Sequence, residues 1–88
     1  LGLICQPSTG DLFVAKQGAG AQLNGRPMHV TGTASISTGL LGVGANFRIP
    51  LRQVSAFIEL LLEAGGMFIR NGSGALMLAQ VASGRLAG

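Results

Sequence analysis

Cysteine, tryptophan and tyrosine are almost absent from this sequence of 88 residues. It holds one cysteine, Cys5, together with four phenylalanines, no tryptophan and no tyrosine. A single cysteine excludes an internal disulfide framework and a zinc site built from several cysteines, and it is consistent with a cytoplasmic location. With so few aromatic rings, single-stranded nucleic acid has little to stack on. We therefore expect no nucleic-acid partner.

Charge is also scarce. Charged residues make up 10% of the chain and hydrophobic residues 48%, whereas about 25% charged residues is usual in a globular domain. This composition excludes a disordered chain, which needs low hydrophobicity and high charge. So short a chain buries only about 60% of its unfolded surface. We therefore expect an interior segment of a longer protein, with part of its apolar surface covered by the remainder.

The positive charges are too dispersed to indicate a binding patch. Six cations outnumber three acids for a net charge of +3, and they are spread along the whole sequence. The longest uncharged stretch, residues 27–47, is rich in serine, threonine, glycine and asparagine, so it does not resemble a membrane span. No basic residue precedes the apolar start, as it would in a secretory signal. We expect no membrane partner.

Residues 1–48 have the pattern of a strand-rich segment. Pro7 to Gly10 is a turn between two runs of strand-forming residues, and Asn24-Gly25 is a strong hairpin signal. Serine, threonine and glycine dominate residues 31–39, which we interpret as a connection. The expected strands are residues 1–6, 11–16, 21–23, 26–30 and 40–44.

Residues 49–88 predict a helix, a strand and a second helix. After Pro50, which suits a first helical turn, apolar residues recur with a period near 3.6 until Gly65-Gly66. They are Leu51, Val54, Phe57, Ile58, Leu61 and Leu62. Residues 67–69 form a short buried-strand candidate. Ser73 is a suitable N-cap for a second helix that ends near Gly84. This helix is apolar on nearly all sides, so we expect it between two layers.

The segment Gly72-Ser73-Gly74 is the most suggestive candidate for a binding site. A Gly-Ser-Gly at a helix start leaves backbone N–H groups unpaired, and with the helix dipole it can cradle an anion or a hydroxyl. The ordinary interpretation is an N-cap with flanking glycines, which the local pattern alone favours roughly two to one. The segment is not a Walker loop, because the Gly-Lys-Ser/Thr of that motif is missing.

The titratable residues offer weaker candidates. His29 stands in an expected strand without a nearby acid or cysteine, so neither a metal site nor a catalytic triad is supported. Asp11 follows a turn, where an aspartate usually bonds to the local backbone. Glu59 and Glu63 lie one helical turn apart and can jointly hold a cation, but such a pair is far more often a solvated face.

Two further residues have alternative interpretations. Cys5 in an apolar strand is typical of a buried small hydrophobic residue rather than a nucleophile. Arg70 either meets an anion near Gly72 or caps a carbonyl group. Three scattered carboxylates do not build a hard-cation site or an acid–base pair, so we assign no catalytic residue and no metal ligand within the chain.

Two blocks of this sequence resemble the inositol monophosphatase family. The stretch GLICQPSTGDLFVAKQGAGAQLNGRPMHV contains the family's "(E/D)LFxAxxGxGAxLNG" strand pair at matching spacing. The stretch RNGSGALMLAQVASGRLAG, residues 70–88, is similar to the family's "RxxGSAALxLAxVAxGRxDG" strand, loop and helix. Residues 50–64 stand where the family has its intervening helix. The resemblance therefore extends over essentially the whole chain.

The resemblance implies an α+β chain that is a segment of a layered αβαβα sugar-phosphatase fold. Residues 1–48 would belong to its central sheet and residues 49–88 would begin its C-terminal half. Family members hydrolyse phosphate monoesters with magnesium, whose ions activate water and clamp the phosphate. The loop that matches Gly72-Ser73-Gly74 contacts substrate in the family, which reverses the preference for an ordinary N-cap. A homodimer is also implied.

The chain departs from the family pattern in ways that limit these expectations. The family's metal ligands are an upstream glutamate, an upstream Asp-Pro-x-Asp-Gly-Thr segment and a downstream Trp-Asp pair, and none is present here. The 88 residues alone are therefore expected to be inactive. Gly74 replaces a usual alanine, which leaves room at the loop, and Ala87 stands where an aspartate is common.

The leading hypothesis is therefore a magnesium-dependent phosphatase of small sugar or inositol phosphates. In it, Gly72, Ser73 and Gly74 would bind substrate and flanking sequence would supply the magnesium ligands. One alternative is a non-catalytic family member or fragment that serves as an assembly module, because sparse charge and high apolar content suit a buried or self-associating surface. Another is a relative specific for nucleotide or other sugar phosphates.

Overall fold

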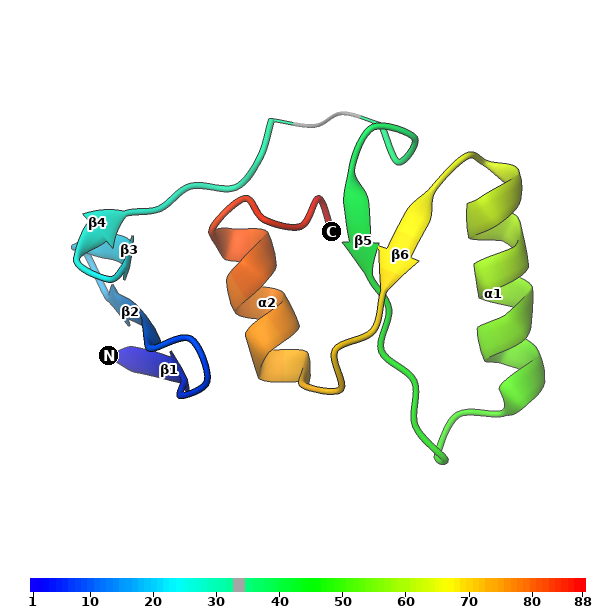
Figure 1. Cartoon of the computed structure of the whole chain (residues 1–88), viewed down its shortest axis with the longest axis horizontal. Coiled ribbons are helices and arrows are strands. Elements are labelled where there is room, and N and C mark those ends of the chain that lie inside the picture. Colours follow the sequence, from blue (N-terminus) through cyan, green and yellow to red (C-terminus); the bar gives the residue numbers. More distant parts are fainter. Residues whose placement is uncertain (33–34) are drawn as a thin grey trace.

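The structure is a computed structural model that describes residues 1–32 and 35–88. Within these ranges, five strands precede the first helix, and a further strand precedes the second helix (Figure 1). The elements are β1 (Gly2–Gln6), β2 (Asp11–Lys16), β3 (Gly20–Leu23), β4 (Arg26–Pro27), β5 (Leu40–Gly42), α1 (Leu51–Glu63), β6 (Met67–Ile69) and α2 (Gly74–Ala82). The predicted α+β class is confirmed.

The first four strands form an antiparallel sheet in the order β1-β2-β3-β4. Its hairpins follow the predicted turns. The amides of Thr9 and Gly10 donate to the carbonyl of Gln6, and Asn24 and Gly25 both have positive φ, 52° and 80°. Two consecutive positive φ values define the tight turn that Asn-Gly favours, because its twist matches that of the flanking strands.

β4 is shorter than the predicted strand 26–30, and His29 lies outside it. Pro27 pairs with Gln22, and the amide of Met28 donates to the carbonyl of Ala21. Beyond that point lie Gly20, the first residue of β3, and the turn that contains Gly18, and both glycines have positive φ. No extended backbone therefore remains for His29 to pair with, and its side chain is exposed.

β5 and β6 form a second, parallel sheet with α1 as the connection between them. Leu40 aligns with Met67, and Gly42 with Ile69. Parallel strands need such a crossover, which is usually a helix. β5 is three residues long instead of the predicted five. This sheet draws one strand from residues 1–48 and one from residues 49–88.

The helices begin and end at the predicted signals. Pro50 is the N-cap of α1, one position earlier than a first-turn proline, and its carbonyl accepts from the amides of Gln53 and Val54. Gly65, with φ of 82°, terminates α1. Ser73 caps the start of α2, and Gly84, with φ of 81°, follows its C-cap. Neither α1 nor α2 has the length and apolar character that a membrane crossing requires, in the part of the chain that the structure describes.

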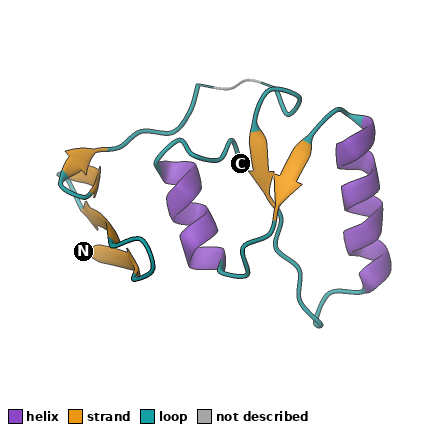
Figure 2. Cartoon of the chain, in the orientation of Figure 1, coloured by secondary structure: helices purple, strands orange, loops and turns teal. Residues whose placement is uncertain are grey.

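The second helix, α2, lies between the two sheets, as its apolar composition predicts (Figure 2). On one side Ala79, which is buried, faces the sheet that holds the buried Phe13. On the other side, Met77 of α2 packs against Gly42 of β5. A Cβ added to Gly42 would lie 3.1 Å from the sulfur of Met77. Leu78 is nonetheless 71% exposed, so the two sheets do not cover the helix completely.

Burial is limited throughout the described residues. The buried hydrophobic side chains are Phe13, Val43, Leu61, Ala79 and Leu86. Of the apolar stripe of α1, Leu61 is buried and Val54 and Ile58 are half-buried, whereas Leu51 is 85% exposed. Met67 of the predicted buried strand is 70% exposed, and Cys5 is exposed instead of buried. Both lie on surfaces against which no described element packs closely.

Candidate functional site

The carboxyl ends of β5 and β6 meet at one edge of the parallel sheet. The loop 43–50 leaves β5 there, and the loop 70–73 leaves β6 beside it. Both helices begin at this same edge (Figure 1). In open α/β arrangements, the crevice outside the carboxyl ends of parallel strands is the usual place for ligands. The predicted segment Gly72-Ser73-Gly74 lies at this edge.

Side chains within the loop hold it in shape. The Ser73 hydroxyl accepts a hydrogen bond of 3.3 Å from the amide of Leu76, which is the N-cap interaction expected of a serine. The amide of Ser73 donates to Asn71 Oδ1 at 2.9 Å, and Asn71 Nδ2 donates to Gln80 Oε1 at 3.1 Å. Asn71 therefore braces the loop against α2. This role of Asn71 was not predicted, although Asn is a common residue in such turns.

The predicted binding residues form an open surface with unpaired donors. Gly72 has φ of 80°, a conformation that favours glycine, and a Cβ at Gly72 or Gly74 would meet nothing within 4 Å. The amides of Gly74 and Ala75 have no hydrogen-bond partner among residues 1–32 and 35–88. Such N–H groups at the positive end of a helix suit an anionic oxygen.

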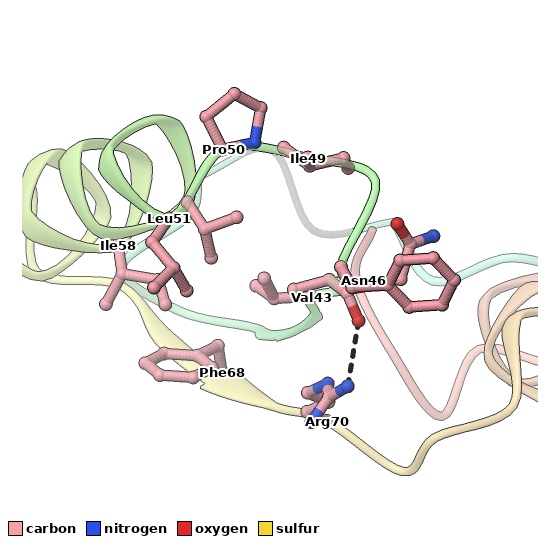
Figure 3. A pocket seen from close by; sticks show the side chains of 11 residues that line it. Val43, Asn46, Ile49, Pro50, Leu51, Ile58, Phe68 and Arg70 are labelled. Carbon is pink, nitrogen blue, oxygen red and sulfur yellow. Dashed lines mark hydrogen bonds between the residues drawn. The ribbon is translucent and has the colours of Figure 1, made fainter.

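Arg70 joins the two loops of this edge. Its Nη2 donates to the carbonyl of Ala45 at 2.8 Å (Figure 3). The carbonyl-capping alternative for Arg70 is therefore realised, but one carbonyl uses only part of the guanidinium's five donors. Within the described residues Arg70 makes no ion pair. Its charge is therefore uncompensated at the edge.

A groove opens between these loops and the start of α1 (Figure 3). Its volume is about 670 Å³, within the range of small-molecule pockets. The lining residues are Val43, Ala45, Asn46, Phe47, Ile49, Pro50, Leu51, Val54, Ile58, Phe68 and Arg70. The groove was not predicted, because its walls come from the loop 43–50, β6 and α1 and are contiguous only in the folded chain.

Asp11 makes a long-range interaction that its sequence position does not predict. Its Oδ1 accepts from Asn24 Nδ2 at 2.9 Å, and its Oδ2 is 3.0 Å from Arg85 Nη1. The hydrogen bond from Asn24, followed by that from Arg85, holds the pKa of the Asp11 carboxyl below its ordinary value. The expectation of a purely local backbone contact was wrong. Asp11 is a structural residue that ties β2 to the segment after α2.

The other candidates do not converge on the edge. Glu59 and Glu63 are exposed in the second half of α1, and His29 and Cys5 are exposed in or near the antiparallel sheet. No three histidine, cysteine or acidic side chains gather into a metal-binding group among the residues described. The residues present therefore do not fit a magnesium centre of their own.

Comparison with known proteins gives a consistent result. The profile of the inositol monophosphatase family matches residues 1–88. The "Nus factor SuhB" of Haemophilus influenzae is 34% identical over 90 residues, which cover 100% of this chain and 34% of the relative. The "Inositol-1-monophosphatase" of Mesorhizobium japonicum is 34% identical over 96 residues, covering 99% of this chain and 34% of the relative.

Solved structures of the same family share the fold. The inositol monophosphatase of Anabaena (Nostoc) has a TM-score of 0.84 at 35% identity, covering 97% of this chain and 36% of its own. The Thermotoga maritima IMPase has a TM-score of 0.85 at 27% identity, covering 97% of this chain and 32% of its own. The chain thus spans about a third of the length of the relatives it matches. The predicted segment of a sugar-phosphatase fold is confirmed, and the chain belongs to the inositol monophosphatase family.

Proposed function

We propose that this chain is the substrate-loop segment of a magnesium-dependent phosphatase that hydrolyses small sugar or inositol phosphates. The observation that carries the proposal is the loop Gly72-Ser73-Gly74, with two unpaired amides beside it at the carboxyl edge of β5 and β6. Membership of the family supports the proposal, since one relative that is 34% identical to this chain is named an inositol-1-monophosphatase.

In this proposal the loop binds the phosphate ester and fixes its orientation. The amides of Gly74 and Ala75 donate to phosphate or ester oxygens, with the positive end of α2 behind them. The Ser73 hydroxyl already accepts from Leu76, and its own hydrogen remains available for donation to the substrate. Glycine at position 74 leaves space for close approach of the ligand.

Magnesium and its ligands are part of the proposal but lie outside the loop. The metal supplies charge neutralisation and an activated water in enzymes of this kind. The described residues contain no group of three possible ligands, so the carboxylates would come from residues beyond 1–88. The 88 residues alone are accordingly expected to be inactive.

The test is steady-state kinetics of the intact protein that carries this chain. Ser73→Trp places a bulky side chain in the loop, and we expect at least a hundredfold loss of kcat/KM for inositol phosphate. Ser55→Trp, on an exposed position of α1, is the matched control and should retain full activity. Wild-type kinetics in the Ser73 variant would contradict the assignment of the loop to substrate binding. Activity that a metal chelator leaves unchanged would contradict the requirement for magnesium. A parallel panel of nucleotide and other sugar phosphates decides the substrate class.

A second candidate function is a non-catalytic assembly module. Two relatives carry the name "Nus factor SuhB" rather than the name of an enzyme, and Leu51, Leu60 and Phe47 are exposed apolar side chains. An intact protein that lacks phosphatase activity on the whole panel, yet forms a stable complex with another macromolecule, would favour this function.

We also propose that the intact protein is a cytoplasmic homodimer. The number of large apolar side chains that are exposed supports the dimer, because apolar surface beyond that of an ordinary monomer is typical of an interface. Light scattering after size exclusion measures the mass directly, and a monomer at micromolar concentration would contradict the dimer. Cell fractionation tests the location.

A further inference from the structure

Four consecutive backbone amides lie at the start of α2, and side chains accept hydrogen bonds from two of them. The amide of Ser73 donates to Asn71 Oδ1 at 2.9 Å, and the amide of Leu76 donates to the Ser73 hydroxyl at 3.3 Å. The two amides between them, those of Gly74 and Ala75, have no partner within the part of the chain that the structure describes. Asn71 and Ser73 thus determine which donors remain for a ligand.

The orientation of the Asn71 side chain is set by a second contact. A carboxamide can direct either its oxygen or its nitrogen toward a neighbour, so one contact alone leaves it free to turn. Asn71 Nδ2 donates to Gln80 Oε1 at 3.1 Å. With its nitrogen directed to Gln80, Asn71 presents its oxygen to the Ser73 amide. The pair therefore fixes the Asn71 side chain, and through it the conformation of the loop.

Gln80 is itself held by the segment that follows α2. Gln80 is half-buried, and its backbone carbonyl accepts from the amides of Arg85 and Leu86 at 2.9 and 3.1 Å. Leu86 is 2% exposed, and Arg85 is paired with Asp11 of β2. Side chains that are locked by packing and by hydrogen bonds hold a binding group in place more precisely than a loop does alone. Gln80 is therefore a firm support for the exposed Asn71.

We propose that Asn71 is a positioning residue for the phosphate ester. By accepting from the Ser73 amide and donating to Gln80, it holds the loop in one conformation. The two free amides then donate to the bound phosphate in a fixed direction. The reaction needs such a direction, because a displacement of about 1 Å can cost roughly a hundredfold in rate. The inference rests on the proposed function and assigns part of the substrate's orientation to a residue that does not contact it.

Steady-state kinetics of the intact protein with magnesium and inositol phosphate test the inference. Asn71→Ala removes both contacts, and we expect kcat to fall about tenfold, because a looser loop holds the ester in the reactive orientation for less of the time. The inhibition constant of inorganic phosphate should stay close to that of wild type, because the two free amides remain. Gln80→Leu removes only the partner that orients the Asn71 carboxamide, so a smaller loss of kcat is expected.

Asn71→Asp separates the position of the loop from its charge. An aspartate oxygen still accepts from the Ser73 amide, and Gln80 can turn its own NH₂ group toward the other oxygen. The geometry is therefore kept, and kcat should remain near that of wild type. The added negative charge repels a phosphate on the neighbouring amides, so KM should rise roughly tenfold at low ionic strength and less at high salt.

Thr9→Ala is the matched control, because it removes a contact of the same kind. Thr9 Oγ1 accepts from the amide of Asp11, also two residues further along the chain, at 3.3 Å. Thr9 is exposed in the turn between β1 and β2. Thr9→Ala should lower the temperature of thermal unfolding without changing kcat or KM.

The outcomes distinguish this inference from the proposed function. If Asn71→Ala and Gln80→Leu lower the unfolding temperature but leave kcat unchanged, Asn71 has a structural role only and the inference is overturned. It is also overturned if Asn71→Asp loses kcat as Asn71→Ala does, because the retained acceptor then does not restore the position. If Asn71→Ala does not fold, the other two variants still decide. A wild-type protein without phosphatase activity, or one that Ser73→Trp leaves fully active, overturns the proposed function and this inference with it.

Discussion

Asp11 and Arg85 form an ion pair of 3.0 Å across 74 positions of sequence. The guanidinium of Arg85 also lies 6.0 Å from the ring centre of the buried Phe13. One arginine that follows α2 thus contacts two side chains of β2. The pair fastens the two blocks of sequence that carry the family resemblance to each other.

The ion pair predicts a stability that depends on pH. The pKa of Asp11 is lowered in the folded protein, so the contribution of the carboxylate is fully present above its unfolded pKa of about 3.9. It is lost as the pH falls through the folded-state pKa. Asp11→Asn should therefore lower the free energy of unfolding at pH 7, and the difference from wild type should vanish in acid.

Urea unfolding from pH 7 down to pH 2 measures this difference. Glu59→Gln is the control, because Glu59 is exposed and makes no ion pair within the described residues. It should change the free energy of unfolding little at any pH. If the free energies of unfolding of Asp11→Asn and wild type differed by the same amount down to pH 2, the ion pair would not be the cause of the difference.

The cap at Ser73 predicts a second effect on stability. Ser73→Ala removes the acceptor for the Leu76 amide, and loss of such a cap costs about 1 kcal/mol. Ser55→Ala removes a hydroxyl that donates within the helix to the carbonyls of Leu51 and Arg52. That contact competes with helical hydrogen bonding, so its loss should be neutral or slightly stabilising. Thermal unfolding compares the two, and equal losses would contradict the capping role.

Gly84 offers a test of close packing after α2. Its φ is 81°, and a Cβ there would lie 3.0 Å from the carbonyl oxygen of His29. Gly10 has φ of 75° but open space around it. Gly10→Ala should therefore cost about 1 kcal/mol of backbone strain, whereas Gly84→Ala should cost about 1–3 kcal/mol more for the collision.

Chemical denaturation of both glycine variants gives the comparison. The difference between them isolates the contact of Gly84 with the segment around His29, since the strain at φ is common to both. If the two variants lose the same stability, the backbone of residues 29–31 does not lie as close to Gly84 in solution.

The sequence predicted those features that depend on a few neighbouring residues. Asn24-Gly25 gives its turn because both residues tolerate positive φ, and Pro50, Ser73 and Gly84 mark helix ends through their own backbone or side-chain chemistry. The location of Gly72-Ser73-Gly74 at a helix start was likewise predicted. Its proposed role in binding substrate stays a prediction.

Features that depend on distant parts of the chain were not predicted. The pair Asp11–Arg85, the parallel pairing of β5 with β6 and the groove all require the chain to be folded first. The strand expected to contain His29 is shorter than predicted, because the strand with which it pairs ends first. The burial expected for Cys5 depended on what covers its strand, and a local apolar pattern does not contain that information.

Residues at the end of the chain complete the surroundings of β5. The amide of Ala87 donates to the carbonyl of Leu40, and the amide of Gly42 donates to the carbonyl of Gly88, both at 2.7 Å. β5 therefore has hydrogen-bonded neighbours on both sides, and both are encoded downstream of it. A ribosome that adds 5–20 residues per second needs about 2–9 s to proceed from Gly42 to Gly88. During translation, β5 therefore cannot complete its hydrogen bonds until that time after its own synthesis.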